Sequence, residues 1–361
     1  MAGELTLCVV NYNGGEALPG VLRAVCGQEP RPAAVILVDN ASTDGGLNLV
    51  RSEFPGVRIL ALPSNDGPAA AREAAFRAAT TSLVGFVDND VTPAPDCFAR
   101  LAAALAANDR AVLAMPRVLH AGAPDIVQFD GARAHFIGLM SLEGAEMPLA
   151  EPPAGTHDIS SIVTACFLVD RRRWGQFRLQ DPSFFIYHED HDLGLRAGQL
   201  GYRILAVPQA VCLHGKGTPE LSIRALGGYS PRRIVLIIAN RWRILLTRYE
   251  LRTLLLLAPT LLLFELVQLV GSLGKGWAAS WLAALGRTVR DLPSIARERH
   301  EWATQRRFGD GRVLEGGPLP FHPRLLTSPL QLAAGRWTSA AAALNWRMVR
   351  RLLRDAPALP R

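Results

Sequence analysis

Short apolar runs alternate with helical patterns over the N-terminal part of the chain. Four continuous apolar runs predict strands buried on both faces, and they cover residues 5–10, 34–38, 57–60 and 83–87. Three intervening segments predict helices, and they cover residues 16–27, 44–53 and 69–79. This alternation predicts an α/β fold in which helices cover a mostly parallel sheet.

The middle of the chain has a weaker pattern. Residues 116–160 are rich in Pro, Gly and polar side chains and predict no particular element. Residues 161–169 predict a strand, residues 190–200 a helix, and residues 202–207 and 210–213 two short closing strands. These elements would complete the sheet that the N-terminal strands begin.

The character of the chain changes after Ser230. Residues 232–248 predict a basic amphipathic helix, and residues 253–273 are almost entirely apolar. We therefore expect two domains: an α/β catalytic domain at residues 1–225 and a basic, helical, membrane-associating region at residues 226–361.

Charge supports this division. The net charge is +7, but residues 231–361 hold 21 Arg and Lys against 8 Asp and Glu, whereas residues 1–230 hold 18 against 24. A basic region can bind nucleic acid or an anionic membrane. Here the basic residues lie between long aliphatic runs such as TLLLLAPTLLLF, which favours a membrane surface as partner and no nucleic acid. A general preference for arginine is the plain alternative.

The apolar segment at residues 253–273 raises the question of how the chain meets the membrane. As a helix it would span about 31 Å, which is enough to cross the hydrocarbon core. Arginines on both sides conflict with a single crossing, because basic segments prefer the cytoplasm. Pro259 and Glu265 also disfavour a straight, lipid-exposed helix. We expect a pair of helices that lie in the cytoplasmic face of the cell membrane or dip into it, peripheral or in-plane, with a helix buried against the catalytic domain as the alternative.

Two further features agree with that location. The five cysteines are scattered and never form a CxxC pair, so we expect free thiols in a reducing compartment. The N-terminus, MAGELTLCVV, lacks the basic region and the cleavage site of a secretory signal.

Acidic side chains follow the predicted strands at their ends. Asp39 begins a turn of small residues, DNASTDGG, and Asp88 and Asp90 flank one residue in VDND after a buried strand. Ligands of such sheets bind at the carboxyl ends of the strands. A carboxylate there can bind a base or ribose, and two can hold magnesium or manganese together with a diphosphate. Each motif alone also fits helix capping or a solvated turn.

A third acidic cluster opens the helix predicted at residues 190–200. Glu189, Asp190 and Asp192 follow an aromatic run in FFIYHEDHD. Carboxylates crowded beside apolar walls have raised pKa values, as a general base requires. Helix capping would account for one acid but not for three. His214 follows a strand in LHGKG, and a lone histidine in that position is more often structural than a ligand.

The motifs VVNYNG, VDNASTDG, NDGPAAARE, VDND, HEDHDLGLR and LHGKG occur in an order and spacing that resemble the family 2 glycosyltransferases. The chain looks most like the bacterial rhamnosyltransferase-like branch, over residues 5–215 and weakly over residues 239–249. This resemblance implies the nucleotide-sugar fold called GT-A and an inverting single displacement. The stretches DGPAAARE and VTACFL depart from the family pattern, which concerns sugar and acceptor specificity rather than the reaction.

The resemblance also implies roles for individual residues. Asp190 would be the catalytic base, with Glu189 beside it. The metal would be a divalent cation, magnesium or manganese, held by Asp88, Asp90 and His214. Asp39 would hold the base or ribose, and Arg72 would lie near the diphosphate. The donor-binding residues would be Asn11, Asn13, Asp39, Asn65, Arg72 and Asp88.

Together these features predict a metal-dependent, inverting glycosyltransferase. It would move a hexosyl or deoxyhexosyl group from a nucleotide-sugar donor to a glycan or lipid-linked acceptor in cell-surface polysaccharide assembly. One alternative is a nucleotidyltransferase, but that class usually has an arginine in the loop after the first strand, and the loop NYNGGEALPG has none. The other alternative is a silent membrane-bound sugar-binding scaffold, against which the intact acidic set argues.

Overall fold

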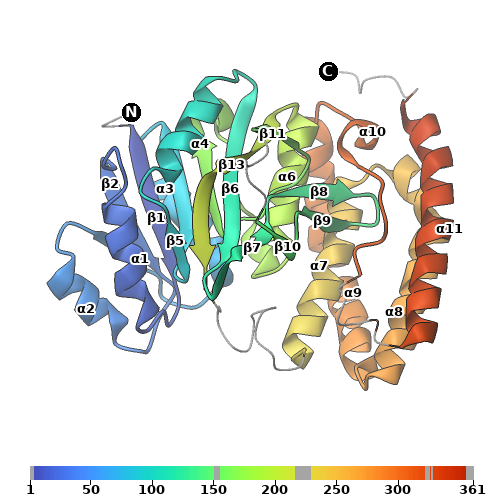
Figure 1. Cartoon of the computed structure of the whole chain (residues 1–361). Helices are drawn as coiled ribbons and strands as arrows, with labels where there is room; N and C mark the ends of the chain where they lie inside the picture. The colour runs from blue at the N-terminus through green and yellow to red at the C-terminus, as the bar shows by residue number, and fades with distance from the viewer. Residues whose placement is uncertain (1–3, 150–154, 216–228, 322–325, 327, 355–361) are drawn as a thin grey trace. The chain divides into compact units, whose positions relative to one another are not determined.

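The computed structural model describes residues 4–149, 155–215, 229–321, 326 and 328–354 (Figure 1). The chain forms two compact units. We call Met1–Ala132, Leu142–Leu193 and Tyr202–Gly227 the sheet unit, and Arg133–Ser141, Gly194–Gly201 and Gly228–Arg361 the helical unit. The domain boundary that the sequence predicts, between residues 225 and 226, lies outside the described residues.

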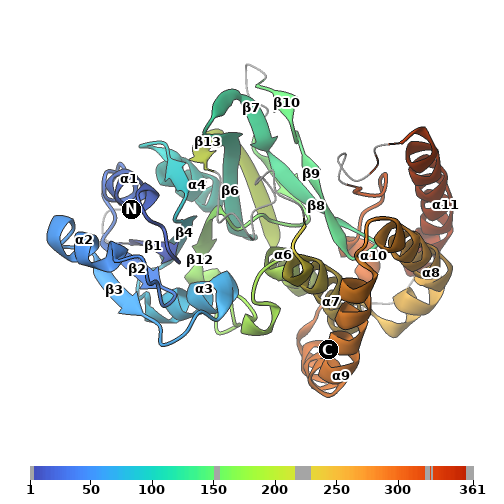
Figure 2. The same ribbon diagram turned by 90° about the horizontal axis from the view of Figure 1, so that it is seen from below.

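The N-terminal half of the sheet unit is parallel, as the apolar runs predict. Its strands adjoin in the order β3-β2-β1-β4 and are β1 (Leu5–Asn11), β2 (Ala34–Asp39), β3 (Arg58–Ala61) and β4 (Leu83–Asp88). The connecting helices are α1 (Ala17–Cys26), α2 (Gly46–Glu53) and α3 (Gly67–Ala78). Figure 2 shows α3 on the opposite face of the sheet from α1. In the strand register Asn11 pairs with Asp39, and Val10 pairs with Asp88. The polar residues at three strand ends therefore meet at one edge.

Antiparallel strands continue the sheet beyond β4. Strand β12 (Cys166–Asp170) lies between β4 and β6 (Ala111–His120), and β13 (Arg203–His214) runs parallel to β6. The remaining strands are β5 (Val91–Pro93), β7 (Ala123–Phe129), β8 (Gly131–His135), β9 (Leu139–Glu143), β10 (Met147–Pro148) and β11 (His157–Ile159). The other helical segments before residue 201 are α4 (Cys97–Ala106), α5 (Arg171–Trp174), the 3₁₀ turn Pro182–Phe184 and α6 (Glu189–Leu200).

Three sequence predictions need correction in this part of the fold. The strand predicted at residues 161–169 is the shorter β12, and Ser161 makes only an isolated bridge to Ala132. The two strands predicted at residues 202–207 and 210–213 are one strand, β13, with an irregularity between Val207 and Val211. Proline 208 lies in that irregularity, where a strand tolerates the missing N–H. The polar stretch at residues 116–160 contains the end of β6 and most of the antiparallel hairpins.

The core of the sheet unit is packed closely around the central strands. A Cβ atom added to Gly85 in β4 would lie 2.4 Å from Cε1 of Phe98 and 2.5 Å from Cδ2 of Leu7. Only glycine lets α4 approach the sheet so closely at this point. The five cysteines are free thiols, as the sequence predicts.

The helical unit contains most of the helices of the C-terminal region. They are α7 (Pro231–Arg248), α8 (Leu251–Gly274), α9 (Ala278–Gln305), α10 (Asp310–Val313) and α11 (Pro329–Arg354). Ser230 caps α7 by accepting a hydrogen bond from the amide of Arg233. Glu298 of α9 pairs with Arg243 and Arg248 of α7. Within the described part of the chain, α8 is the one helix long and apolar enough to cross a membrane, and 22% of its most apolar window is buried.

Candidate functional site

The ends of β1 and β2 are joined by a compact set of hydrogen bonds. Nδ2 of Asn11 donates to Oδ1 of Asp39 at 2.8 Å, and the hydroxyl of Ser42 donates to the same oxygen at 2.6 Å. The amide of Ser42 donates to Oδ2 of Asp39 at 3.0 Å. Both oxygens of the buried Asp39 carboxylate thus accept hydrogen bonds, which fix the turn after β2.

Neighbouring loops are tied to the same turn by asparagines. Nδ2 of Asn89 donates to Oδ1 of Asn11 at 3.0 Å, which links the VDND turn to the end of β1. Oδ1 of Asn13 accepts from the amide of Thr43 at 2.8 Å. An amide side chain can donate one hydrogen bond and accept another. It can therefore join two loops where a carboxylate, which only accepts, could not.

Asn65 holds the start of α3. Its Oδ1 accepts from Nδ2 of Asn40 at 2.9 Å and from the amide of Gly67 at 3.1 Å. Gly67 has a φ of +86°, and a Cβ there would lie 2.3 Å from the carbonyl oxygen of Phe185. Only glycine is compatible with this close approach of α3 to the loop that precedes α6.

Arg72 lies behind the edge of the sheet, between two acidic motifs that are far apart in the sequence. It is 2% exposed, and its Nη2 donates to Oδ1 of Asp88 at 2.6 Å. Its Nη1 donates to Oε1 of Glu189 at 3.3 Å. The guanidinium therefore bridges the end of β4 to the start of α6, so the VDND and HEDHD motifs form one site. Because Arg72 is buried, direct contact with a diphosphate stays a prediction.

The three acids at the start of α6 differ in exposure. Glu189 is 6% exposed and Asp192 is fully buried, whereas Asp190 is half-buried. Of the three, Asp190 is therefore the least buried residue.

Burial shapes the electrostatics of this cluster. Desolvation, followed by the charge of Asp190, raises the pKa of Glu189 to about 8. Desolvation raises the pKa of Asp190 to about 6, against the lowering effects of the His191 amide and of Arg72. Desolvation also raises the pKa of Asp88, although Arg72 opposes the shift. Glu189 and Asp190 titrate as a pair, because a charge on one disfavours a charge on the other.

The loop before α6 has a constrained backbone. Phe185, Tyr187 and His188 have φ values of +62°, +71° and +67°, which residues other than glycine rarely adopt. Such conformations cluster at functional sites, where the surrounding structure fixes them. Here the carbonyl oxygen of Phe185 lies against Gly67 and accepts a hydrogen bond from the amide of Ala69 at 3.4 Å, five residues before Asp190.

Asp90 and His214 meet at the end of β13. Nε2 of His214 lies 3.4 Å from Oδ1 of Asp90, and the amide of Gly215 donates to the carbonyl oxygen of Asp90 at 2.7 Å. Nδ1 of His214 lies 2.9 Å from Oε1 of Gln128, an oxygen that can only accept. This partner places the proton on Nδ1, which leaves Nε2 facing Asp90 as a possible metal ligand.

These residues fit a divalent cation that is completed by a substrate. No group of three or more His, Cys, Asp or Glu side chains is arranged to hold a metal alone within the described residues. Mg²⁺ is commonly bound by one or two carboxylates together with substrate phosphates. Asp90 and His214 offer one carboxylate and one imidazole, and Arg72 occupies one oxygen of Asp88. The donor set therefore suits a metal that arrives with a diphosphate.

The structure groups eight of the ten predicted residues into three connected sets, and it leaves Asn65 bonded to Asn40 and Asp190 bonded to the amide of His191. Asn11, Asn13 and Asp39 share one network, Arg72, Asp88 and Glu189 a second, and Asp90 and His214 a third. Sequence reasoning missed Ser42, Asn89 and Gln128 as partners. Ser42 and Asn89 lie inside motifs that already stood out, but Gln128 lies in a stretch without pattern.

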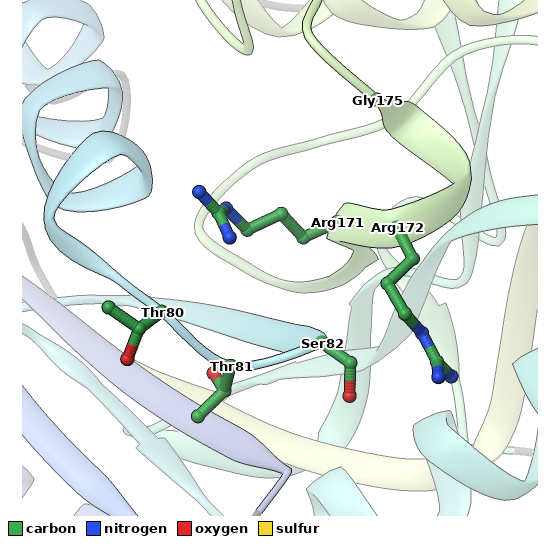
Figure 3. Close-up of a pocket in the computed structure, with 6 residues that line it drawn as sticks. All are labelled: Thr80, Thr81, Ser82, Arg171, Arg172 and Gly175. Atoms are coloured by element: carbon green, nitrogen blue, oxygen red, sulfur yellow. The ribbon is translucent and has the colours of Figure 1, made fainter.

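A surface hollow elsewhere in the sheet unit contains none of these residues (Figure 3). It has a volume of about 410 Å³ and is lined by Thr80, Thr81, Ser82, Arg171, Arg172 and Gly175. It adjoins the residues just before β4 begins, whereas Asp88 ends that strand. The hollow therefore lies at the opposite end of β4 from the candidate site.

Comparisons with known proteins agree with this arrangement. Residues 6–136 match the family model Glycosyl transferase family 2. The chain is 29% identical over 245 residues to N-acetylglucosaminyl-diphospho-decaprenol L-rhamnosyltransferase of Mycobacterium tuberculosis (strain H37Rv), which covers 60% of this chain and 77% of that protein. It is 32% identical over 99 residues to succinoglycan biosynthesis protein ExoO of Rhizobium meliloti (strain 1021), which covers 27% of this chain and 28% of that protein.

A solved structure supports the fold. The structure of GalNAc-T7 with UDP, GalNAc and Mn²⁺ superposes with a TM-score of 0.54 at 18% identity, over 68% of this chain. The match spans 48% of that longer chain. The sheet unit thus has the GT-A fold.

Residues 6–136 thus match a family 2 glycosyltransferase domain, and the chain has a modest similarity to a rhamnosyltransferase. The fold class and the family that the sequence predicts are both confirmed.

Proposed function

We propose that this glycosyltransferase moves a sugar from a nucleoside diphosphate donor to a lipid-linked or glycan acceptor, with inversion at the anomeric carbon. The observation that carries the proposal is the Arg72 bridge, which joins the aspartate motif of β4 to the acid cluster of α6 in one site. The mycobacterial relative is named for an acceptor on a decaprenyl diphosphate, which supports a lipid-linked acceptor here.

Asp190 would act as the general base. A sugar hydroxyl is a weak nucleophile, and a positioned carboxylate removes its proton as attack develops. Asp190 is the least buried of the three acids, while Glu189 is held by Arg72. Its raised pKa also makes it a stronger base than an ordinary aspartate. Glu189 would keep Arg72 and the start of α6 in place beside it.

The donor would bind along the strand ends. Asn11, Asn13, Asp39 and Asn65 would bind the nucleotide through loops that hydrogen bonds already fix. This preorganisation lowers the entropy cost of binding. Arg72 would act on the diphosphate through its charge rather than by contact, because its guanidinium is occupied by two carboxylates.

Magnesium or manganese would be held by Asp90 and His214, with Asp88 beside them. The ion supplies positive charge that stabilises the leaving diphosphate. Asp90 and Asp88 would orient the ion at the edge of the sheet, and Gln128 would keep Nε2 of His214 available to it.

The enzyme would bind its acceptor at the cytoplasmic face of a membrane. The helical unit is basic and contains α8, whose apolar surface is mostly outside the core. Anionic lipids attract such segments to the cytoplasmic leaflet. Lipid-linked acceptors are then reached by an enzyme that stays on the membrane surface.

Donor binding tests the proposal directly. Nucleoside diphosphates and their sugars should raise the melting temperature of the protein when manganese is present, because they bind only the native state. Asp90→Ala should lose the manganese-dependent part of this shift. Asp109→Ala, which removes a fully exposed carboxylate in the same unit, is the matched control. If no nucleoside diphosphate shifts the wild-type protein, or if Asp90→Ala keeps the full manganese effect, the proposed site is wrong.

A further inference from the structure

Helix α8 exposes a long apolar row. Six residues spaced by three, four or seven positions are between 57% and 70% exposed, and they are Leu251, Leu255, Leu262, Leu266, Val270 and Leu273. This spacing places them on one side of the helix. Isolated exposed leucines are ordinary on soluble proteins, but a row of this length marks a surface that binds something apolar.

Helix α11 exposes a second apolar row. Leu330 and Trp337 are both 80% exposed, and Leu344, Met348 and Leu352 continue the row at 59%, 55% and 48%. The spacing again places them on one side of their helix. The sequence pattern alone predicted little for this segment, since small residues between the large ones weaken its periodicity.

The two helices pack side by side within the helical unit, as both views show (Figures 1 and 2). Thr260 donates to Oδ1 of Asn345 at 2.8 Å, and Nδ2 of Asn345 approaches the carbonyl oxygen of Leu256. Nη2 of Arg252 donates to the carbonyl oxygen of Leu352 at 2.9 Å. The start of α8 therefore meets the end of α11, so the helices are antiparallel.

This packing brings both apolar rows to the same side of the pair. On α8 the exposed Leu251 and Leu255 each precede by one position a residue that contacts α11, namely Arg252 and Leu256. On α11 the exposed Leu344 likewise precedes Asn345. One residue is about 100° of helix rotation. Each apolar row is therefore rotated by about 100°, in the same sense along its own chain, from the residues that contact the other helix. Because the two helices run in opposite directions, this rotation turns both rows to the same side of the pair, where they form one surface.

A basic edge borders this surface. Arg336, Arg347, Arg350 and Arg351 are exposed on α11 and are turned away from the residues that contact α8. The described part of α11 contains no acidic residue, and the acidic residue of α8, Glu265, is paired with the buried Arg241. An apolar surface with a positive edge complements an anionic lipid bilayer. A second copy of the same surface would bring like charges together.

We propose that α8 and α11 together form a docking surface for an anionic bilayer and that the pair lies in the plane of the interface. The apolar rows would enter the boundary between headgroups and acyl chains, and the arginines would contact the lipid phosphates. Trp337 would lie at headgroup depth, where tryptophan is favoured. This inference extends the proposed function, which requires a membrane but does not say which surface binds it.

Vesicle binding by the full chain tests the docking surface. We expect the wild-type protein to float with phosphatidylcholine vesicles that contain phosphatidylglycerol, and to bind pure phosphatidylcholine more weakly. Leu262→Ser/Leu266→Ser on α8 and Trp337→Ser/Leu344→Ser on α11 should each weaken binding at least about tenfold, because each removes two apolar side chains that would enter the bilayer. Arg347→Gln/Arg350→Gln should weaken binding to the anionic vesicles by roughly fivefold per arginine and leave the weaker binding unchanged.

Leu332→Ser is the matched control, because Leu332 is 45% exposed on α11 but lies outside the apolar row. It should bind as the wild type does. The proposal fails if only the α8 variant is released, if the Leu332 variant is released equally, or if light scattering shows that these variants dissociate a dimer. Donor-induced shifts in melting temperature should persist in every variant, so loss of membrane binding is distinguishable from failure of the proposed function.

Discussion

At the scale of single residues, the unusual feature is a buried arginine shared by two acidic motifs. Arg72 offsets the charge of Asp88 and holds Glu189, whose raised pKa of about 8 leaves it mostly protonated at neutral pH. This sharing separates the roles of the acids. Glu189 is committed to the bridge, while Asp190 beside it is half-buried and raised in pKa.

Replacing Asp190 by asparagine tests its role as the base. Asp190→Asn keeps the shape and removes the proton acceptor, so transfer should fall by roughly 10²–10⁴-fold while donor binding persists. In the wild type, transfer should also decline as the pH falls below about 6, because a protonated Asp190 cannot accept a proton. The residual activity of Asp190→Asn should lack that decline. Near wild-type turnover in the variant would assign the role to Glu189 or Asp192.

Removing Arg72 should destabilise the protein. In Arg72→Met, Asp88 loses its cation, and the buried Glu189 loses the guanidinium that opposes the rise of its pKa and so becomes fully protonated. Breaking one side of a buried ion pair costs about 3–5 kcal/mol, less where water reaches the remaining charge, so the melting temperature should fall clearly. Arg72→Lys should be intermediate, because one ammonium group cannot reproduce the forked geometry. Arg77→Met is the control on the same helix, since its ion pair with Glu73 involves a side chain that is 69% exposed. Equal melting temperatures for the Arg72 and Arg77 variants would contradict the bridge.

At the scale of elements, the sequence predicts the centre of the sheet better than its antiparallel part. Strands β1, β2 and β4 are covered on both faces, so they appear as continuous apolar runs. Strand β6 contains Pro116 and Arg117 and does not look like a buried strand. Arg117 is nevertheless buried, because Asp130 on a neighbouring segment pairs with it at 2.5 Å. Such a partner is visible only in the folded chain.

In the candidate site, too, some features can be predicted from the sequence and others are visible only in the folded chain. The acidic residues at the strand ends follow from the pattern, because a strand that ends in a carboxylate is a local feature. The contacts of Arg72 with Glu189 and of Gln128 with His214 each join segments more than eighty residues apart in the sequence. The contact of Arg72 with Asp88 is more local. Local periodicity carries no information on such pairs, and family resemblance suggested Arg72 only as a donor-pocket residue.

Gly67 controls how the loop before α6 is placed. Gly67→Ala should lower stability and transfer together, because its φ is +86° and the added Cβ would lie 2.3 Å from the carbonyl oxygen of Phe185. Backbone strain alone costs about 1–3 kcal/mol, and displacement of the loop would move Asp190. Gly20→Ala in α1 is the control, since a Cβ there meets nothing within 4 Å. That variant should be neutral or slightly stabilising. A Gly67→Ala protein with normal melting and turnover would show that this contact does not position the base.

At the scale of the whole molecule, charge and hydrophobicity are divided along the chain in the same way. The acidic sheet unit contains the candidate site, and the basic region at residues 231–361 contains the apolar helices α8 and α11. This division would place the positive charge where the proposed docking surface meets anionic lipid. The site for the anionic, water-soluble donor lies in the other part of the chain. The docking surface therefore has an electrostatic part and an apolar part, which respond differently to salt.

Ionic strength should separate these two parts. The Debye length falls from about 10 Å at 0.1 M salt to about 3 Å at 1 M, so the attraction between the exposed arginines of α11 and anionic headgroups is strongly screened at high salt. Flotation with vesicles containing phosphatidylglycerol should then weaken until it equals that with phosphatidylcholine alone, which should itself change little. The residual binding reports the apolar rows, and Trp337→Ser/Leu344→Ser should remove most of it. Arg347→Gln/Arg350→Gln should show a shallower salt dependence than the wild type. If binding is insensitive to salt, the arginines do not contact the lipid, and a purely apolar insertion of α8 explains membrane association better.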